Sequence, residues 1–334
     1  MKQYKYIIKT IFIIGLLYGV NKTGTTAAKF LSIEVGSNAV GMGGAYTSIA
    51  KDATAMYWNP AGLSFHDTKE VYFNHANWIA DISFDYFGIT FPMNNKSVLG
   101  FNITSVTMDE MEVTRYGNED TGETFRAADY AIGSTYALDL TDRFSVGFNG
   151  KYIQQSIANS HAKGFAVDFG TLFITPFGFT LGTSISNFGP KLKMSGDDLL
   201  VGADVDENIE GNNESVTGIL STDYFDLPLV LRIGISDEFQ IGVRNKLVVS
   251  LDAISPNDNA NYINTGAKIH LFDGLISFYA GLNSLFLENA ESEFSFGGGL
   301  TIPQILNNSL SIYFTHEQMK FLGNSQQLSI SFNY

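Results

Sequence analysis

The chain has 334 residues, a length that fits one large domain or two ordinary ones. Hydrophobic residues make up 45% of it and charged residues only 16%, below the roughly 25% typical of soluble domains. The formal net charge of −14 disfavours binding to nucleic-acid phosphates, and the absence of cysteine excludes disulfides and thiolate metal sites.

Residues 1–28 predict a cleavable secretory signal peptide. The segment has a basic start, formed by Lys2, Lys5 and Lys9. The apolar core at 11–20 is far shorter than the roughly 20 residues that a spanning helix needs. Small residues follow, so we expect cleavage after Ala27 or Ala28. The alternative is that the segment stays attached as an anchor.

The next stretch, 40–64, is rich in glycine and small residues, with the sequence VGMGGAYTSIAKDATAMYWNPAGLS. Its glycines permit close backbone approaches, and Asn59-Pro60 is a turn signal. Apolar residues recur at helical spacing over 45–56, which predicts a short helical piece. The spacing of the glycines is not that of a dinucleotide loop, and an Asn-Pro-Ala water-channel motif would need spanning helices that the chain lacks. We predict that residues 29–66 form a plug.

From residue 67 to 334 the chain reads as strand after strand. In strand 96–107, for example, large apolar residues alternate with glycine, asparagine and threonine, which places the two sets on opposite faces. Near Tyr86-Phe87 the alternation changes phase, which predicts a β-bulge. The predicted strands cover 68–77, 82–93, 96–107, 129–140, 143–155, 164–174, 177–187, 228–238, 245–255, 260–271, 274–284, 293–302, 309–317 and 326–334.

These strands predict a 14-stranded antiparallel outer-membrane β-barrel over 67–334, because a closed bacterial barrel has an even number of strands. The even-numbered connections are short, whereas most odd-numbered ones are long: 108–128, 156–163, 188–227, 285–292 and 318–325. Two odd-numbered connections, 78–81 and 256–259, are short exceptions. Short turns on one side and long extracellular loops on the other are typical of outer-membrane barrels, and a soluble β-sandwich has no reason to keep this parity.

Five charged residues fall on the polar face of the predicted strands: Lys151, Asp168, Arg232, Asp252 and Lys268. Charge on a lipid-facing surface costs roughly 2–4 kcal/mol for Arg or Lys at mid-bilayer, so we expect these side chains to face the lumen. One interpretation is that they pair with one another or with plug residues such as Lys51 and Asp52. The other is that they line a polar conduction or ligand path.

The loop 188–227 is strongly acidic, and we single out Asp197, Asp198, Asp204, Asp206, Glu207 and Glu210 as a candidate docking surface. A solvated surface loop is the simpler interpretation. The sequence DVDENIEGNNE does not have the ligand spacing of an EF-hand, although calcium binding stays open. The five histidines stand singly, and no G-x-S-x-G elbow occurs. We therefore expect no catalytic site, no metal site and no cofactor.

The stretch FLSIEVGSNAVGMGGAYTSIAKDATAMYWNPAGL resembles the N-terminal signature of PorV/PorQ-type outer-membrane proteins, a branch of the FadL-like barrels. Later segments at 185–189 and 256–267 resemble the same family, and the chain ends as such barrels do, in an alternating segment that closes on Tyr334. The residues of the motif that we single out are Gly41, Gly43, Gly44, Asp52, Trp58, Asn59, Pro60 and Gly62.

This resemblance implies a non-enzymatic component of type IX protein secretion in the outer membrane of a Gram-negative-type bacterium. Its partners would be outer-membrane lipid and either a large secretion-translocon barrel or the C-terminal domains of secreted cargo, which it would pass to the surface-attachment machinery. No nucleic acid is expected. The alternative is FadL-like transport of hydrophobic small molecules, with a ligand held in the barrel, and a third interpretation is a barrel that only anchors a complex.

Overall fold

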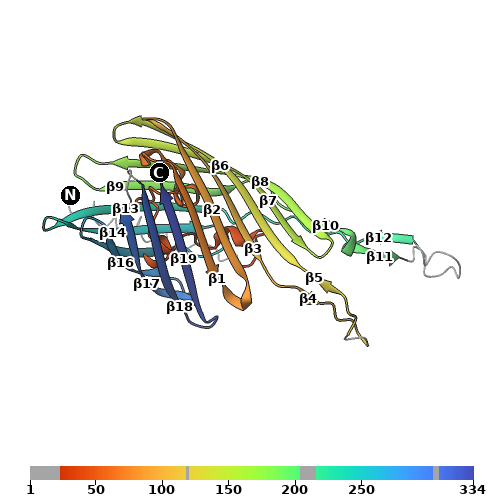
Figure 1. Ribbon diagram of the computed structural model, residues 1–334. Coiled ribbons are helices and arrows are strands. Elements are labelled where there is room, and N and C mark those ends of the chain that lie inside the picture. The colour runs from red at the N-terminus through yellow and green to blue at the C-terminus, as the bar shows by residue number, and fades with distance from the viewer. Residues whose placement is uncertain (1–22, 118–119, 204–215, 304–307) are drawn as a thin grey trace, which may run out of the picture.

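The computed structural model describes residues 23–117, 120–203, 216–303 and 308–334. In these residues one large antiparallel sheet closes on itself (Figure 1). The sheet holds 15 strands, of which β10 is a two-residue addition beside β8, and the pairing of β8 with β9 closes the other 14 into a ring. The predicted 14-stranded antiparallel β-barrel is thereby confirmed, and a two-sheet sandwich is excluded.

The strands of the ring follow the predicted ranges closely. They are β1 (Glu70–Asn77), β2 (Ser83–Asn94), β3 (Ser97–Thr107), β6 (Ala127–Thr141), β7 (Phe144–Ile157), β8 (Ser160–Ile174), β9 (Thr180–Phe188), β13 (Val230–Ile241), β14 (Asn245–Pro256), β15 (Tyr262–Leu271), β16 (Ile276–Leu285), β17 (Ser292–Pro303), β18 (Ser309–Met319) and β19 (Asn324–Asn333). Five short strands lie outside it or beside it: β4 (Met111–Glu112), β5 (Thr124–Phe125), β10 (Ser195–Gly196), β11 (Leu200–Ala203) and β12 (Val216–Ile219).

The wall of the barrel has an apolar outer face and a polar, small-residue inner face. In β3, Phe101 is 44% exposed whereas its neighbour Asn102 is 5% exposed, and other strands repeat this alternation. Large apolar side chains that stay exposed around a closed ring fit contact with lipid. The same period of two that predicts the strands therefore sets which side chains turn inward.

The bulge predicted near Tyr86-Phe87 is wrong. The pairing of β2 with β3 runs through these residues without a shift, and the register changes only between Pro92 and Asn94. The alternation looks broken in the sequence because Phe84 and Tyr86 are aromatic and yet face inward, where both are fully buried. They pack against the N-terminal part of the chain, which gives large apolar residues a place on the inner face.

The described N-terminal segment, residues 23–66, lies inside the ring as short coils and turns (Figure 1). It contains η1 (Lys29–Ser32), α2 (Ser37–Gly41), α3 (Ala55–Trp58) and η2 (Pro60–Phe65). The predicted helical piece over 45–56 begins only at Ala55. Most of that range forms turns, because backbone N–H groups such as that of Thr47 bond to wall side chains instead of to their own helix.

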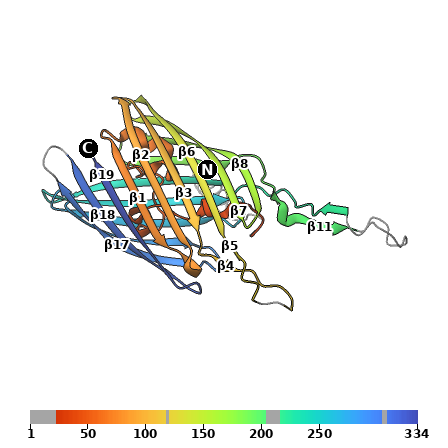
Figure 2. The ribbon, with the colours of Figure 1, turned by 45° about the vertical axis from the view of Figure 1, so that its right-hand side comes forward.

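The two ends of the barrel differ in the length of their connections. At one end, which we call the long-loop end, two hairpins made of β4–β5 and β11–β12 project beyond the ring (Figure 2). Two further short helices lie at this end, η3 (Ile79–Asp81) and η4 (Asp197–Leu199). The predicted long loop 156–163 is wrong, because β7 and β8 extend to a tight turn in which Ala158 has a φ of 48°. Among the described residues, no helix is both long and apolar enough to cross a bilayer.

Candidate functional site

The motif residues of the N-terminal segment lie against glycines of the wall. Gly43 has a φ of +65°, and a Cβ there would come within 2.8 Å of the backbone nitrogen of Leu282. On the wall side, a Cβ on Gly182 would lie 2.5 Å from the carbonyl oxygen of Thr47. Other wall glycines are as close to the segment's backbone: Gly147, Gly266 and Gly281. We missed these wall glycines in the sequence, although glycine at inward positions of alternating strands is the signal that could have found them.

Asn59 joins the N-terminal segment to itself and to the wall. Its Nδ2 donates to the carbonyl oxygens of Thr47 (2.9 Å) and Thr171 (3.0 Å), and its Oδ1 accepts from the N–H of Ala61 (3.2 Å). Asn59 also caps η2, whose first residue is Pro60, a position where a missing N–H costs nothing. The Asn-Pro pair is therefore a structural joint buried in the lumen.

The remaining motif residues are also packed inside. The indole of Trp58 is 1% exposed and donates from Nε1 to the carbonyl oxygen of Val35 at 2.9 Å. Gly41, Gly44 and Gly62 are buried, each where a Cβ would meet a neighbouring group. These residues lie in short helices and turns on the inner side of the ring.

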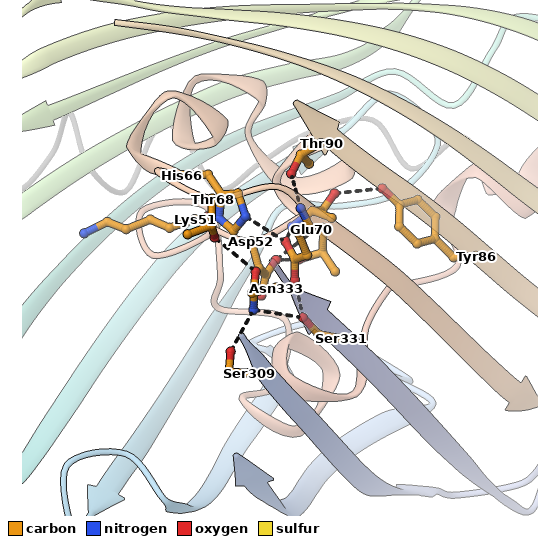
Figure 3. A network of polar contacts seen from close by, with 12 residues as sticks. Lys51, Asp52, His66, Thr68, Glu70, Tyr86, Thr90, Ser309, Ser331 and Asn333 are labelled. Carbon is orange, nitrogen blue, oxygen red and sulfur yellow. Dashed lines mark hydrogen bonds and ion pairs between the residues drawn. The ribbon is translucent and has the colours of Figure 1, made fainter. Parts of the chain in front are cut away.

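Figure 3 shows a network of polar contacts that ties the N-terminal segment to the first and last strands. The carboxylate of Glu70, on β1, accepts hydrogen bonds from the N–H of Ala53 (2.6 Å) and from Oγ of Ser331 on β19 (2.5 Å). His66 Nε2 lies 3.5 Å from the same carboxylate. Asp52 accepts from the N–H of Thr54 at 2.9 Å. Glu70 therefore links the segment to the two strands whose pairing joins the ends of the barrel sequence.

The histidine of this network is held by the backbone. His66 Nδ1 lies 3.1 Å from the carbonyl oxygen of Lys51 and donates to it. Burial lowers the pKa of His66, and its Nε2 is buried without a hydrogen-bond partner among the described residues. The Lys51 side chain points away from the network, with Nζ 5.4 Å from the centre of the Phe65 ring. Our reasoning from sequence found Asp52 but missed His66 and Glu70.

The five predicted lumen charges divide into separate contacts. Lys151 Nζ and Asp168 Oδ1 form an ion pair at 2.8 Å, and Asp168 also accepts from the N–H of Asn187 at 2.7 Å. Asp252 accepts from the N–H of Thr47 at 2.8 Å, so this wall carboxylate holds the N-terminal segment directly. The charges do not pair with Lys51 or Asp52 in the described residues.

The two other wall cations lie against aromatic rings. The guanidinium of Arg232 lies 5.5 Å from the ring of Tyr57 and 5.4 Å from that of Trp58. Lys268 Nζ lies 5.4 Å from the ring of Tyr313, and in the described part of the chain no carboxylate lies within ion-pair distance of it. Cation–π contacts and burial thus replace ion pairs at these two positions.

The N-terminus is fixed at the long-loop end. Thr26 forms a parallel β-bridge with Asp226, and its Oγ1 donates to Oδ2 of Asp258 at 2.7 Å. Lys29 Nζ reaches the same oxygen at 2.6 Å. Nearby, a buried apolar cluster that includes Phe30 joins the segment to Leu192, in the loop that follows β9. The segment therefore runs through the barrel from the long loops to the start of β1.

A cavity of about 570 Å³, which we call the mouth cavity, opens at the long-loop end. The N-terminal residues Phe30, Ile33 and Glu34 line one part of it. The connections β1–β2, β14–β15, β16–β17 and β18–β19 contribute further residues, together with strand residues such as Asn283 and Glu317. Burial, with the Glu317 carboxylate nearby, raises the pKa of Glu34 from its ordinary 4.5 to about 8. A second cavity of about 340 Å³ lies at the opposite end and is lined mainly by polar residues of β13–β15.

The acidic loop is only partly described. Asp197 and Asp198 lie in η4, while Asp204, Asp206, Glu207 and Glu210 lie outside the described residues. Asp198 accepts from the N–H of Asn159 at 2.7 Å, and these hydrogen bonds lower the pKa of its carboxyl group. This aspartate therefore anchors the loop to the turn between β7 and β8. In the described ranges, no group of three or more His, Cys, Asp or Glu side chains could hold a metal ion.

Comparisons with known proteins place this geometry in a family. The model of the family "Type IX secretion system protein PorV" matches residues 19–204. Among solved structures the chain is similar to the Pseudomonas putida toluene transporter TodX (TM-score 0.56, 11% identity, 95% of this chain and 99% of that one). It is also similar to a Pseudomonas aeruginosa FadL homologue (TM-score 0.51, 13% identity, 96% of this chain and 99% of that one). A third similar structure is the CymD monoaromatic hydrocarbon channel (TM-score 0.57, 14% identity, 90% of this chain and 97% of that one). At these identities the likeness shows the fold alone, and no curated protein matches the sequence.

Proposed function

The chain belongs to the PorV family of type IX secretion system proteins, and we propose that it is a non-enzymatic outer-membrane component which binds secreted cargo or the translocon and passes cargo to the surface-attachment machinery. The family match over 19–204 is the observation that carries this proposal. Fold alone would not, because barrels of this architecture host different functions.

The long-loop end is the proposed contact surface, and we place it outside the cell, where outer-membrane barrels carry their longer loops. The β11–β12 hairpin projects beyond the ring there (Figure 2), with Leu200, Ile219 and Leu220 all exposed. Exposed apolar side chains on a projecting hairpin favour a protein partner. The β4–β5 hairpin, within loop 108–128, is the second contact candidate.

Two further assignments belong to this proposal. Residues 1–28 serve as the signal peptide, of which only 23–28 lie within the described residues. Its removal takes away the contacts of Thr26 and leaves the ion pair of Lys29 with Asp258 to hold the mature N-terminus at the long-loop end. Residues 29–66 act as a plug that fills the lumen, a role supported by the burial of Met42, Met56 and Leu63 among inward-facing wall residues. A barrel of this width needs such a filling, since its wall side chains alone leave an open interior.

The test is excision of the β11–β12 hairpin. Leu220 N donates to the carbonyl oxygen of Leu199 at 2.8 Å, so residues 200–219 can be replaced by Asn-Gly while the two flanking residues stay paired. Asp198 and its bonds to the β7–β8 turn are retained. A parallel variant replaces residues 113–123 with the same dipeptide, because Met111–Glu112 and Thr124–Phe125 already pair.

Both variants are purified in mild detergent from native outer membranes, and captured proteins are identified by mass spectrometry. We expect one or both excisions to remove secreted proteins or a large translocon barrel from the capture. The difference in gel migration before and after boiling reports whether each barrel is folded. Unchanged capture by both folded variants, and by a variant with both excisions, would refute the docking role of these hairpins.

The second candidate function is transport of hydrophobic small molecules, and the mouth cavity is the observation that favours it. Its volume of about 570 Å³ lies within the range of small-molecule sites, and apolar residues such as Trp78, Ile79 and Met319 line it. The test is uptake of toluene by cells with and without the protein. Equal uptake rates would exclude this function for toluene.

A further inference from the structure

The mouth cavity has apolar walls and an acidic floor. Side chains of Phe30, Ile33, Trp78, Ile79 and Leu287 supply much of the wall. Glu34, from the N-terminal segment, and Glu317, from β18, both line the cavity as well. Apolar surface surrounding two carboxyl groups is an unusual lining for a site that would take a neutral hydrocarbon.

Both carboxyl groups have an oxygen without a partner. Glu34 Oε1 accepts from Nδ2 of Asn283 at 3.2 Å, whereas its Oε2 is buried and has no hydrogen bond. Glu317 is 6% exposed, and its Oε1 accepts from Oγ of Ser292 at 2.5 Å. The described residues supply no hydrogen bond to its other oxygen. A buried acceptor without a donor costs roughly 1–3 kcal/mol, more when it is charged. This cost applies to Oε2 of Glu34, so the floor of the cavity favours a donor from outside.

The neighbouring cations of the chain are engaged elsewhere. Lys29 Nζ bonds to Asp258 at 2.6 Å. Arg232 donates to Oγ of Ser186 at 3.1 Å and stacks on Tyr57 and Trp58. Among the described residues, neither Glu34 nor Glu317 forms an ion pair. The charge of Arg232 still acts on Glu34, but neither carboxyl group has a cation within ion-pair distance in the part of the chain that the structure describes.

We propose that the mouth cavity binds a small organic cation, with an ammonium group between Glu34 and Glu317 and an apolar body against the cavity wall. An ammonium group has three donors and can bond to both carboxyl groups. Its positive charge would favour the ionised form of Glu34, whose pKa burial raises to about 8. The rings of Trp78 and Tyr262, which also line the cavity, suit a cation through their π faces. A neutral ligand would supply no positive charge to the acids, and an anionic one would be repelled.

The probe is 4-phenylbutylamine, compared with 4-phenylbutanol and 4-phenylbutyrate, which share its apolar body and differ in the head group. The chain has two tryptophans, and only Trp78 lines the cavity, so its fluorescence reports binding to the purified barrel. We expect the amine to bind about ten- to a hundredfold more tightly than the alcohol, the range of a charge-assisted hydrogen bond. The carboxylate should bind most weakly.

The double variant Glu34→Gln, Glu317→Gln should bind the amine and the alcohol equally. Glu293→Gln is the matched control, because it removes one negative charge near the same end from an exposed side chain outside the cavity. Trp78→Phe should abolish the signal. Equal affinity of the three probes for the unmodified protein, or an amine preference that survives in the folded double variant, would overturn the proposal. If the double variant does not fold, the comparison of the three probes on the unmodified protein decides.

Cation binding in the mouth cavity does not depend on the role in secretion. The mouth cavity and the projecting hairpins are formed by different residues, so a folded Glu34→Gln, Glu317→Gln variant should keep its captured proteins. Loss of amine binding with retained capture would separate the two sites. Tight binding of all probes without preference for the amine would favour a hydrophobic-ligand site instead.

Discussion

Substitution of Asn59 by alanine tests how the N-terminal segment is held in the barrel. The change removes three hydrogen bonds, of which those to Thr47 and Ala61 are buried and that to Thr171 is partly buried. Within the described residues, the Thr47 carbonyl and the Ala61 N–H form no other hydrogen bond. Each buried group left unpaired costs about 1–3 kcal/mol, so two of them suggest a cost of about 3 kcal/mol.

The cost should appear as local opening of the segment, because the wall ladder does not depend on Asn59. A loss of about 3 kcal/mol raises the population of the opened segment about 100-fold. Hydrogen exchange measured by mass spectrometry on peptides covering 43–65 should accelerate by that factor, while peptides from β14 and β18 keep their rates. Limited proteolysis should cut the same region first.

Asn94→Ala is the matched control, since that side chain makes one exposed hydrogen bond, to the N–H of Lys96. It should leave exchange within 43–65 unchanged. Exchange in Asn59→Ala that rises by less than about threefold, or that rises equally throughout the barrel, would contradict the reasoning. The first result would mean that Asn59 is not a joint, and the second that the segment and wall open together.

Three other predictions concern the interior. Burial raises the pKa of Glu34 to about 8, so above pH 4.5 the folded state binds more protons than the unfolded state. The free energy of unfolding should therefore fall as pH rises from about 4.5 to 8. In denaturant unfolding, Glu34→Gln should remove that part of the pH dependence. Gly43→Ala should lower the free energy of unfolding by about 1–3 kcal/mol. Gly117 has a similar positive φ but open space around it, so Gly117→Ala should cost less. Equal changes in Tm would contradict the close contact at Gly43. Lys151→Met or Asp168→Leu alone should each lower the free energy of unfolding by about 3–5 kcal/mol, because each leaves a buried charge without its partner. The double variant should lose much less, and a double-mutant cycle in denaturant unfolding checks this.

The ring of strands could be predicted because it depends on local pattern. In β3 the side chains of Phe101 and Ile103 are exposed while Asn102 and Thr104 are buried, as their alternation indicates. Most wall strands repeat a period of two, although β17 does not, and turn residues also depend on local sequence. Strand number, and with it the closed barrel, could be inferred from the sequence for this reason.

The interior was less predictable because it depends on which distant residues meet. Phe84 and Tyr86 led to the wrong prediction of a bulge in β2. Nothing nearby in the sequence indicates that the lumen is filled and can bury aromatic rings. Glu70 looked like an ordinary residue at a strand start. Its partner Ser331 stands 261 positions away in the sequence, and only the pairing of β1 with β19 brings the two together.

The acidic loop shows the same limit on a surface. The acidic charge of 188–227 predicted one docking segment, yet the first part of this loop packs against the barrel. Beyond Asn187, which has a φ of 65°, the chain leaves the β8–β9 ladder, and Leu192 then packs in a buried cluster with Phe30. Asp198 anchors the base of the β11–β12 hairpin to the β7–β8 turn. Charge counts treat all these residues alike, whereas the contacts separate a wall portion from the projecting hairpin.

The N-terminal segment and the closed ring require each other. The segment forms little regular secondary structure, so many of its backbone donors are satisfied by wall side chains: Ser37 N by Ser329, Gly43 N by Ser295, Thr47 N by Asp252 and Ala53 N by Glu70. Outside the ring these donors would have only water, and inside an open ring Glu70 would lack the Ser331 that completes its bonding. Conversely, the wall glycines leave a space that only this backbone fills. Seating of the segment and pairing of β1 with β19 are therefore energetically coupled.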